Sequence, residues 1–218
     1  MAGRLITLEG GEGVGKSSLA KKLASWLRSK GINVVETREP GGTLISDQIR
    51  ALFKSPPEGE ELKSETEALL VSAARMQHVT HLISPALKAD SWVICDRFAD
   101  STRVYQGLLG GVPLNDLEWL IKFSTAGIEP SLTFLLDCDV DVSRSRIAKS
   151  SGNRDDASRY DQAHQTVHER LRKGFRQLAG FYPSRFYILD ASEPKDAIFA
   201  AAVAELESRF FKDISSHG

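Results

Sequence analysis

Residues 10–17 read GGEGVGKS, and this G-x-x-x-x-G-K-S pattern constrains the fold more than any other feature of the chain. The apolar run RLITLE at residues 4–9 precedes it, and a stretch with helical spacing of apolar residues follows it. A strand that turns through glycines into a helix presents backbone N–H groups and the positive end of the helix dipole to an anion. The sequence therefore predicts a phosphate-binding loop (P-loop) between the first strand and the first helix of an α/β domain.

Short apolar runs alternate with longer helical patterns along the rest of the chain. Chains organised in this way form parallel sheets with helices on both faces. We therefore expect a three-layer α/β P-loop fold with a five-stranded parallel sheet, in one domain over residues 1–212, and a disordered tail at residues 213–218. The predicted strands are residues 4–9, 33–37, 91–96, 132–137 and 186–189, and the predicted helices are residues 17–29, 44–53, 64–89 and 193–211.

Several local signals refine the predicted helices. Ser64 and Glu67 have the spacing of a capping box at the start of the third helix. Pro85 should kink that helix or end it. Ser192 is placed to cap the last helix, and the Leu69–Leu70 pair is expected in the core.

The composition excludes several classes of protein. The net charge of −1 gives no sign of a polyanionic partner such as nucleic acid. No apolar run approaches the ~20 residues that span a bilayer, and the first residues do not form a signal peptide. Cys95 and Cys138 lack metal-ligand spacing, so we expect buried thiols in a reducing compartment. His164 and His168 have zinc-like spacing without a third ligand, so we expect surface histidines. The chain is therefore expected to be cytoplasmic, without a nucleic-acid or membrane partner.

The P-loop residues have defined chemical roles. Lys16 should reach the β- and γ-phosphates of a nucleoside triphosphate, and Ser17 should bind Mg²⁺. The chain has no N-K-x-D motif for reading guanine, which argues against a GTPase. A P-loop alone leaves ATPases and several kinases open. The residues expected to bind the triphosphate are Gly10, Gly11, Glu12, Gly13, Val14, Gly15, Lys16, Ser17 and Ser18.

Three further segments narrow the choice: TREPGGT at residues 37–43, AARMQ at residues 73–77 and DRFADSTRVYQG at residues 96–107. With these motifs the chain resembles the bacterial thymidylate kinases, and the resemblance runs from the first strand to the last helix. It implies transfer of the γ-phosphate of ATP to dTMP, giving dTDP and ADP for dTTP biosynthesis. It also implies a homodimer, and Mg²⁺ as the cofactor that accompanies ATP.

The resemblance assigns roles to residues of these motifs. Arg50 would clamp the acceptor phosphate, Arg97 would contact the phosphates of both substrates, and Glu12 would meet the 3′-hydroxyl of the deoxyribose. Arg75 would read the base, because a guanidinium only donates hydrogen bonds and thymine presents an acceptor at O4. The expected dTMP-binding residues are Glu12, Glu39, Pro40, Arg50, Val71, Arg75, Arg97, Ser101, Thr102 and Tyr105, and the expected metal ligands are Ser17, Asp96 and Glu39. The Glu39–Pro40 bond is a candidate cis bond.

A basic stretch surrounds the polar segment SSGNRDDAS at residues 150–158. We expect this segment to form a mobile lid over about residues 149–160. The resemblance implies that such a lid supplies catalytic arginines where the P-loop has none. Residues 158–161, SRYD, match the lid motif of the family in degraded form, which favours Arg159 and leaves Arg154 as a competitor. Arg144 is expected to contact ATP.

The chain departs from the family at Val71, where the relatives usually carry a phenylalanine that stacks on thymine. Two explanations remain open. Another aromatic residue, for example Phe98, fills the space, or the acceptor binds more weakly because stacking contributes roughly 1–3 kcal/mol.

The expected mechanism needs no general base, because the attacking phosphate oxygen is already ionised. The catalytic residues are therefore the cations Lys16, Arg97, Arg159 and Arg154. A deoxynucleoside kinase, which would need a carboxylate base, is the alternative enzyme. A P-loop switch that only binds the triphosphate is the alternative outside enzymes.

Overall fold

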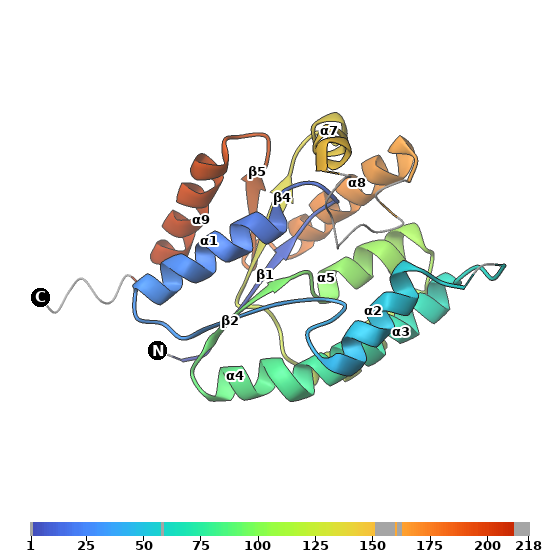
Figure 1. Cartoon of the computed structure of the whole chain (residues 1–218), viewed down its shortest axis with the longest axis horizontal. Helices are drawn as coiled ribbons and strands as arrows, with labels where there is room; N and C mark the ends of the chain where they lie inside the picture. The colour runs from blue at the N-terminus through green and yellow to red at the C-terminus, as the bar shows by residue number, and fades with distance from the viewer. Residues whose placement is uncertain (1, 58, 151–159, 161–162, 212–218) are drawn as a thin grey trace, which may run out of the picture.

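The computed structural model of the chain describes residues 2–57, 59–150, 160 and 163–211. Within these residues, five strands form one parallel sheet in the order β2-β3-β1-β4-β5 (Figure 1). The predicted five-stranded parallel sheet is confirmed, and each strand begins and ends close to its predicted position. The strands are β1 (Leu5–Glu9), β2 (Val34–Arg38), β3 (Trp92–Asp96), β4 (Leu132–Asp137) and β5 (Phe186–Asp190).

Helices connect the strands. The predicted first, second and last helices are present, and the third is present as α3, η1 and α4 in succession. The helices between residues 99 and 181 had no predicted bounds. The helices are α1 (Lys16–Ser29), α2 (Leu44–Lys54), α3 (Ser64–His78), the π-helix η1 (Val79–Ile83), α4 (Ser84–Lys88), α5 (Ala99–Thr102), the π-helix η2 (Arg103–Leu109), α6 (Leu114–Thr125), α7 (Val140–Ser150), α8 (Gln165–Phe181) and α9 (Lys195–Phe210).

Alternate residues of the central strand face opposite sides of the sheet, as the pleat of a strand requires. Ile6 and Leu8 face the side covered by α1 and α9, and Leu5 faces the side covered by α3, α4 and α6 (Figure 1). A third apolar cluster packs α8 against η2 and β4. Helices therefore cover both faces of the sheet, which confirms the three-layer α/β fold.

The parallel sheet also decides where the sequence motifs meet. Leu8 in β1 and Arg38 in β2 are both in register with Asp96 in β3. The segments that follow these three strands therefore leave from the same edge of the sheet. They are the P-loop, the TREPGGT segment and the DRFADS segment, and carboxyl edges of this kind are where α/β sheets bind ligands.

The predicted capping box at the start of α3 is wrong. Lys63 occupies the N-cap position, and no side chain makes a capping hydrogen bond there. Glu67 turns inward instead, where its Oε2 accepts a hydrogen bond from Gln106 Nε2 at 2.9 Å. The Glu67 carboxylate therefore bonds a buried side chain of η2 and does not cap the start of α3.

At two other predicted helix ends the structure is different from the expectation. Ser192 is not a cap, because α9 begins at Lys195 and the Ser192 hydroxyl donates to Asp190 Oδ1 at 2.5 Å. Near Pro85 the helix neither ends nor continues regularly. It passes through the π-helical turn η1 and resumes as α4, with Pro85 in the first turn of α4. Helical residues precede Pro85, so its ring interrupts the regular hydrogen bonds of the helix, and the irregular turn η1 lies just before it.

The burial of two side chains is the reverse of the prediction. Leu69 was expected in the core but is 57% exposed, because Ala68 and Val71 occupy the inward face of α3. His168 was expected at the surface but is buried, because α8 packs against η2 and β4. His164 is the N-cap residue of α8, where it accepts from the Thr166 backbone N–H.

Cys95 and Cys138 are buried free thiols, as predicted. Burial raises the pKa of both, which keeps them in the neutral form. In the part of the chain that the structure describes, no helix has both the length and the apolar character needed to cross a membrane.

Candidate active site

The loop between β1 and α1 has the backbone geometry that phosphate binding requires. Gly13 has a φ of 73°, and a Cβ there would lie 2.6 Å from the carbonyl oxygen of Ser143, so only glycine fits. Gly15 has a φ of 100° and is the N-cap residue of α1. The helix therefore begins at Lys16, with the positive end of its dipole at the loop.

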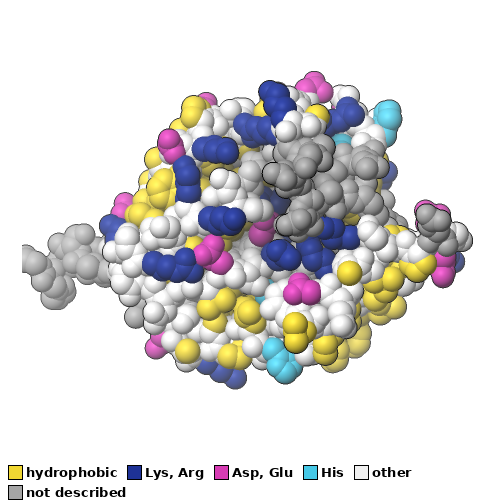
Figure 2. All heavy atoms as spheres, viewed as in Figure 1, with side chains coloured by type: hydrophobic (Ala, Val, Ile, Leu, Met, Phe, Trp, Pro, Cys, Tyr) yellow, Lys and Arg dark blue, Asp and Glu magenta, His cyan; other side chains and the backbone are white. Residues whose placement is uncertain are grey.

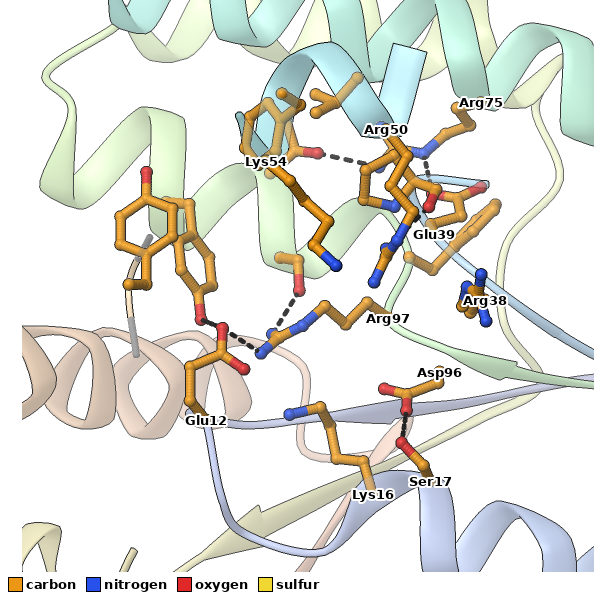
Figure 3. Close-up of a pocket in the computed structure, with 18 of the residues that line it drawn as sticks. Glu12, Lys16, Ser17, Arg38, Glu39, Arg50, Lys54, Arg75, Asp96 and Arg97 are labelled. Atoms are coloured by element: carbon orange, nitrogen blue, oxygen red, sulfur yellow. Dashed lines mark hydrogen bonds and ion pairs between the residues drawn. The ribbon is translucent and has the colours of Figure 1, made fainter. Parts of the chain in front are cut away.

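Lys16 and Ser17 open this helix. Lys16 is buried, and its Nζ donates to the carbonyl oxygens of Gly10 at 3.2 Å and Gly11 at 2.6 Å. Burial, followed by the nearby charge of Arg97, lowers the pKa of Lys16. The Ser17 hydroxyl donates to Asp96 Oδ2 at 2.6 Å, which joins the P-loop to the end of β3 (Figure 3).

A cavity of about 530 Å³ lies above the P-loop, and basic side chains gather around it (Figures 2 and 3). Every residue that the sequence assigned to dTMP lines this cavity, as do most of those assigned to the triphosphate. The lining residues are Glu12, Gly13, Gly15, Lys16, Ser17, Ser18, Arg38, Glu39, Pro40, Arg50, Phe53, Lys54, Val71, Arg75, Asp96, Arg97, Phe98, Ser101, Thr102, Tyr105, Gln106 and Tyr160.

A few predicted site residues do not line this cavity. Gly10, Gly11 and Val14 of the P-loop line a smaller cavity instead. Arg144, on α7, donates to Gln165 Oε1 at 3.4 Å. The lid arginines Arg154 and Arg159 lie outside the described residues, as do most of the predicted lid and the tail at 213–218, so these assignments stay predictions.

Glu12 and Arg97 meet at the centre of the cavity (Figure 3), and the Tyr105 hydroxyl bonds Glu12. Glu12 Oε1 lies 2.9 Å from Arg97 Nη2 and accepts a hydrogen bond from the Tyr105 hydroxyl at 3.1 Å. Burial alone would raise the pKa of Glu12, but the charges of Arg97 and Lys16 bring it down to about 2. Glu12 is therefore a carboxylate that can accept a further hydrogen bond from a hydroxyl group.

Arg97 itself has an unusual backbone. Its φ is 70°, in the left-handed region that side chains other than glycine rarely adopt. Its N–H donates to the Leu8 carbonyl at 2.9 Å, and its Nη1 donates to Gly10 O at 3.0 Å and Ser101 Oγ at 3.1 Å. Strained residues held in this way cluster at functional sites.

Arg50 and Arg75 occupy the half of the cavity under α2 and α3. Arg50 Nη1 donates to the Pro40 carbonyl at 2.8 Å, and the Glu39–Pro40 bond is cis, as the sequence suggested. Arg75 is buried. Its Nε donates to Glu39 Oε2 at 2.8 Å and its Nη2 donates to Thr102 Oγ1 at 2.9 Å. Both guanidinium groups are therefore held in fixed orientations by neighbouring oxygens.

Glu9, the last residue of β1, was not predicted to belong to the site. Glu9 is fully buried and accepts hydrogen bonds from the backbone N–H groups of Phe98 and Ser101 and from the Ser101 hydroxyl. Burial and the negative charge of Asp100 raise the pKa of Glu9 to about 7. Glu9 thereby ties β1 to the segment that carries Arg97.

Several more residues near the site were not assigned a role. Phe53 and Lys54 extend the helical face of Arg50, which the three- and four-residue spacing signals. Arg38 precedes Glu39 in the TREPGGT segment, and both side chains line the cavity. Tyr160 and His78 had no signal, because their partners are distant in sequence. The Tyr160 ring packs edge-on against Tyr105 at 4.8 Å between centroids.

The site offers oxygen ligands to a divalent cation. Mg²⁺ keeps several waters and takes one or two protein oxygens plus substrate phosphates, so the adjacent oxygens of Ser17 and Asp96 suit it. Within the described residues, no three or more His, Cys, Asp and Glu side chains gather as a metal site. Both oxygens of Glu39 are engaged by Arg75 and His78, so Glu39 is a weaker candidate ligand than Asp96.

Comparison with known proteins agrees with this geometry. The family model described as thymidylate kinase matches residues 8–202. A thymidylate kinase from Geobacillus sp. (strain WCH70) is 39% identical over 204 residues, covering 94% of this chain and 96% of the relative. One from Pseudomonas entomophila (strain L48) is 42% identical over 206 residues, covering 94% and 96%.

The fold agrees as well. The crystal structure of thymidylate kinase from Ehrlichia chaffeensis superposes with a TM-score of 0.76 at 28% identity, covering 94% of this chain and 100% of that one. The match in sequence and fold thus extends over the whole site, from the P-loop to the acceptor half of the cavity. The chain therefore belongs to the thymidylate kinase family, the ATP-dependent kinases that phosphorylate dTMP.

Proposed function

We propose that the P-loop side of the cavity holds the phosphates of ATP and that the side under α2 and α3 holds dTMP. The observation that carries this division is that all ten residues assigned to dTMP line one cavity with Lys16 and Asp96. Lys16 would contact the transferred phosphoryl group from the donor side. Arg97, at the centre, would contact the phosphates of both substrates.

Catalysis in this arrangement is positioning and charge neutralisation. The acceptor oxygen of dTMP is ionised at neutral pH, so it attacks without losing a proton to the protein. Arg50 and Arg97 orient the acceptor phosphate, and Lys16 neutralises charge on the donor. Glu12, whose pKa is about 2, accepts a hydrogen bond from the 3′-hydroxyl of the acceptor.

Mg²⁺ would enter with ATP and be held by Ser17 and Asp96, directly or through water. When bound, it supplies further neutralisation of phosphate charge. The support for this is the chemistry of the two oxygens and their position at the start of α1, where the triphosphate would lie.

A coupled assay tests the assignment. With ATP and Mg²⁺ supplied, ADP should form rapidly with dTMP, and only at background level with thymidine or with no acceptor. Faster reaction with thymidine would support a deoxynucleoside kinase instead. ADP formation that needs no acceptor would support a triphosphate hydrolase.

The base of dTMP would lie against an apolar wall made by Val71 of α3 and Phe53 of α2. Phe98 cannot supply a stacking surface, because it is fully buried and the guanidinium of Arg75 lies 5.4 Å from its ring centroid. Phe53 lines the same cavity as Val71 and is only partly buried. Phe53 is therefore the aromatic side chain that we assign to the base.

We also propose a homodimer formed through α2, α3 and α6. These helices pack side by side and expose large apolar side chains, and Figure 2 shows hydrophobic side chains along the edge of the molecule where α2 and α3 lie. On α6 the rings of Trp119 and Phe123 stack on each other at 5.3 Å while both stay exposed. The exposed residues on the three helices are Leu44, Ile45, Leu52, Leu69, Leu114, Trp119 and Phe123.

A further inference from the structure

A buried chain of hydrogen bonds runs from β2 to the proposed base-reading arginine. Thr37 Oγ1 lies 2.7 Å from His78 Nε2, and His78 Nδ1 lies 3.1 Å from Glu39 Oε1. Glu39 Oε2 then accepts from Arg75 Nε at 2.8 Å. His78 is fully buried, and Glu39 and Arg75 are 4% and 2% exposed. His78 thus bonds one carboxylate oxygen of Glu39, and Arg75 bonds the other.

The donors and acceptors in this chain have fixed roles. A carboxylate only accepts hydrogen bonds, so His78 Nδ1 must carry the proton that it shares with Glu39. Nε2 then accepts from the Thr37 hydroxyl when the ring is neutral. Each oxygen of Glu39 consequently has one donor, which holds the carboxylate in a single rotamer.

Gly42 leaves the space that His78 needs. A Cβ on Gly42 would lie 2.6 Å from both His78 Nε2 and Thr37 Oγ1, and its φ of 88° also favours glycine. Three positions of the TREPGGT segment therefore serve one histidine: Thr37 and Glu39 bond it, and Gly42 makes room for it.

This series of hydrogen bonds ends at a guanidinium nitrogen that has no hydrogen-bond partner among the described residues. Arg75 Nε donates a hydrogen bond to Glu39, and Arg75 Nη2 donates one to Thr102. The third nitrogen, Nη1, is buried and has no hydrogen-bond partner in the part of the chain that the structure describes. Arg75 lines the cavity. We infer that His78 is a positioning residue for base selection, which acts through Glu39 to hold Arg75 so that Nη1 meets an acceptor on the base. This inference rests on the base-reading role proposed for Arg75.

Two nearly matched substitutions separate positioning from simple packing. In His78→Asn the amide nitrogen takes the place of Nδ1 and keeps the bond to Glu39. In His78→Gln the longer amide reaches the place of Nε2, keeps the bond to Thr37 and loses the bond to Glu39. His81→Gln, on an exposed histidine in the next turn, is the control. For each variant, kcat/KM is measured with dTMP and with dCMP, together with KM for ATP and the melting temperature.

We expect His78→Gln to reduce the preference for dTMP over dCMP by about tenfold or more, because a misoriented Nη1 no longer donates a hydrogen bond to O4 of thymine. His78→Asn should keep the preference within about threefold of wild type, and His81→Gln within about twofold. KM for ATP should change little in all three. The melting temperature should fall by a similar amount in the two His78 variants, because each loses one hydrogen bond.

Equal preferences in His78→Asn and His78→Gln would overturn the inference. Arg75→Gln separates this failure from failure of the proposed base reading. If Arg75→Gln loses the preference while the other variants keep it, Arg75 reads the base without help from His78. If Arg75→Gln also keeps the preference, the base-reading role is wrong and the inference is wrong with it.

Discussion

At the scale of single residues, Lys16 carries the clearest expectation. Its Nζ lies against the P-loop carbonyls, on the donor side of the cavity. Lys16→Ala should lower turnover with dTMP to below about a tenth of wild type, because such groups contribute several kcal/mol to the transition state. The dissociation constant of dTMP, measured by calorimetry without ATP, should stay close to wild type. Lys22→Ala, on a half-buried lysine of the same helix that pairs with Asp196, is the control and should leave both quantities unchanged.

Glu9 provides a test of pH dependence. Its pKa is raised to about 7 in the folded chain, above the ordinary value, so the folded state binds the proton more tightly than the unfolded state does. The stabilisation from this group is therefore complete at pH values below about 4.5 and is lost as the pH rises through 7. Relative to wild type, Glu9→Gln should gain stability on raising the pH over this window, by up to about 3 kcal/mol.

Urea denaturation of both proteins at several pH values measures this difference. A glutamine mimics the protonated acid, since its oxygen can still accept from the Phe98 and Ser101 N–H groups. Glu61→Gln, at an exposed carboxylate, is the control for general effects of charge. A difference between wild type and Glu9→Gln that does not vary with pH would show that Glu9 is ionised throughout.

At the scale of secondary-structure elements, α2 and α3 together shape the base wall. The Ser46 hydroxyl donates to the Ala74 carbonyl at 2.8 Å and holds the two helices together. Both Phe53 and Val71 line the cavity from these helices. A large residue on one helix and a smaller one on the other fill the wall without overpacking it.

Moving the aromatic side chain from α2 to α3 tests the assignment. Phe53→Leu should raise KM for dTMP by roughly tenfold with little change in kcat, because base stacking contributes equally before and in the transition state. Adding Val71→Phe to that variant should restore most of the loss. KM for ATP serves as the internal control. If Phe53→Leu leaves KM for dTMP unchanged, no aromatic residue stacks on the base and the enzyme simply binds its acceptor more weakly.

At the scale of the whole molecule, the exposed apolar side chains of α2, α3 and α6 determine association. Trp119→Glu places a charge at the centre of the stacked pair on α6. This change should convert a dimer into monomers, because burying an unpaired charge in an interface is strongly unfavourable. Sedimentation equilibrium measures the mass directly.

Phe181→Glu is the matched control, because Phe181 is an equally exposed aromatic residue outside the proposed dimer surface. It should leave the mass unchanged. Dissociation by Phe181→Glu but not by Trp119→Glu would place the interface at α8 instead.

Much of this protein is determined by local sequence. The G-x-x-x-x-G-K-S loop between an apolar run and a helix predicted the P-loop, because glycines and hydrogen-bonded turns act over a few residues. The alternation of short and long patterns predicted the parallel sheet. The carboxyl ends of parallel strands meet at one edge, so the motifs near Glu39 and Arg97 had to converge there, and both residues line the cavity. Arg75 lies inside α3, so the packing of that helix brings it to the same cavity.

Tertiary structure decided the rest, because it depends on partners that are distant in sequence. The strand order β2-β3-β1 brings Glu9 under Phe98, and that burial is what raises its pKa. Glu67 has the spacing of a helix cap, but Gln106 lies across from it and bonds it in the interior. His78 becomes a partner of Glu39 only when α3 packs beside β2. Local patterns carry the backbone geometry, whereas the partner of a buried polar side chain is chosen by how the helices and strands pack.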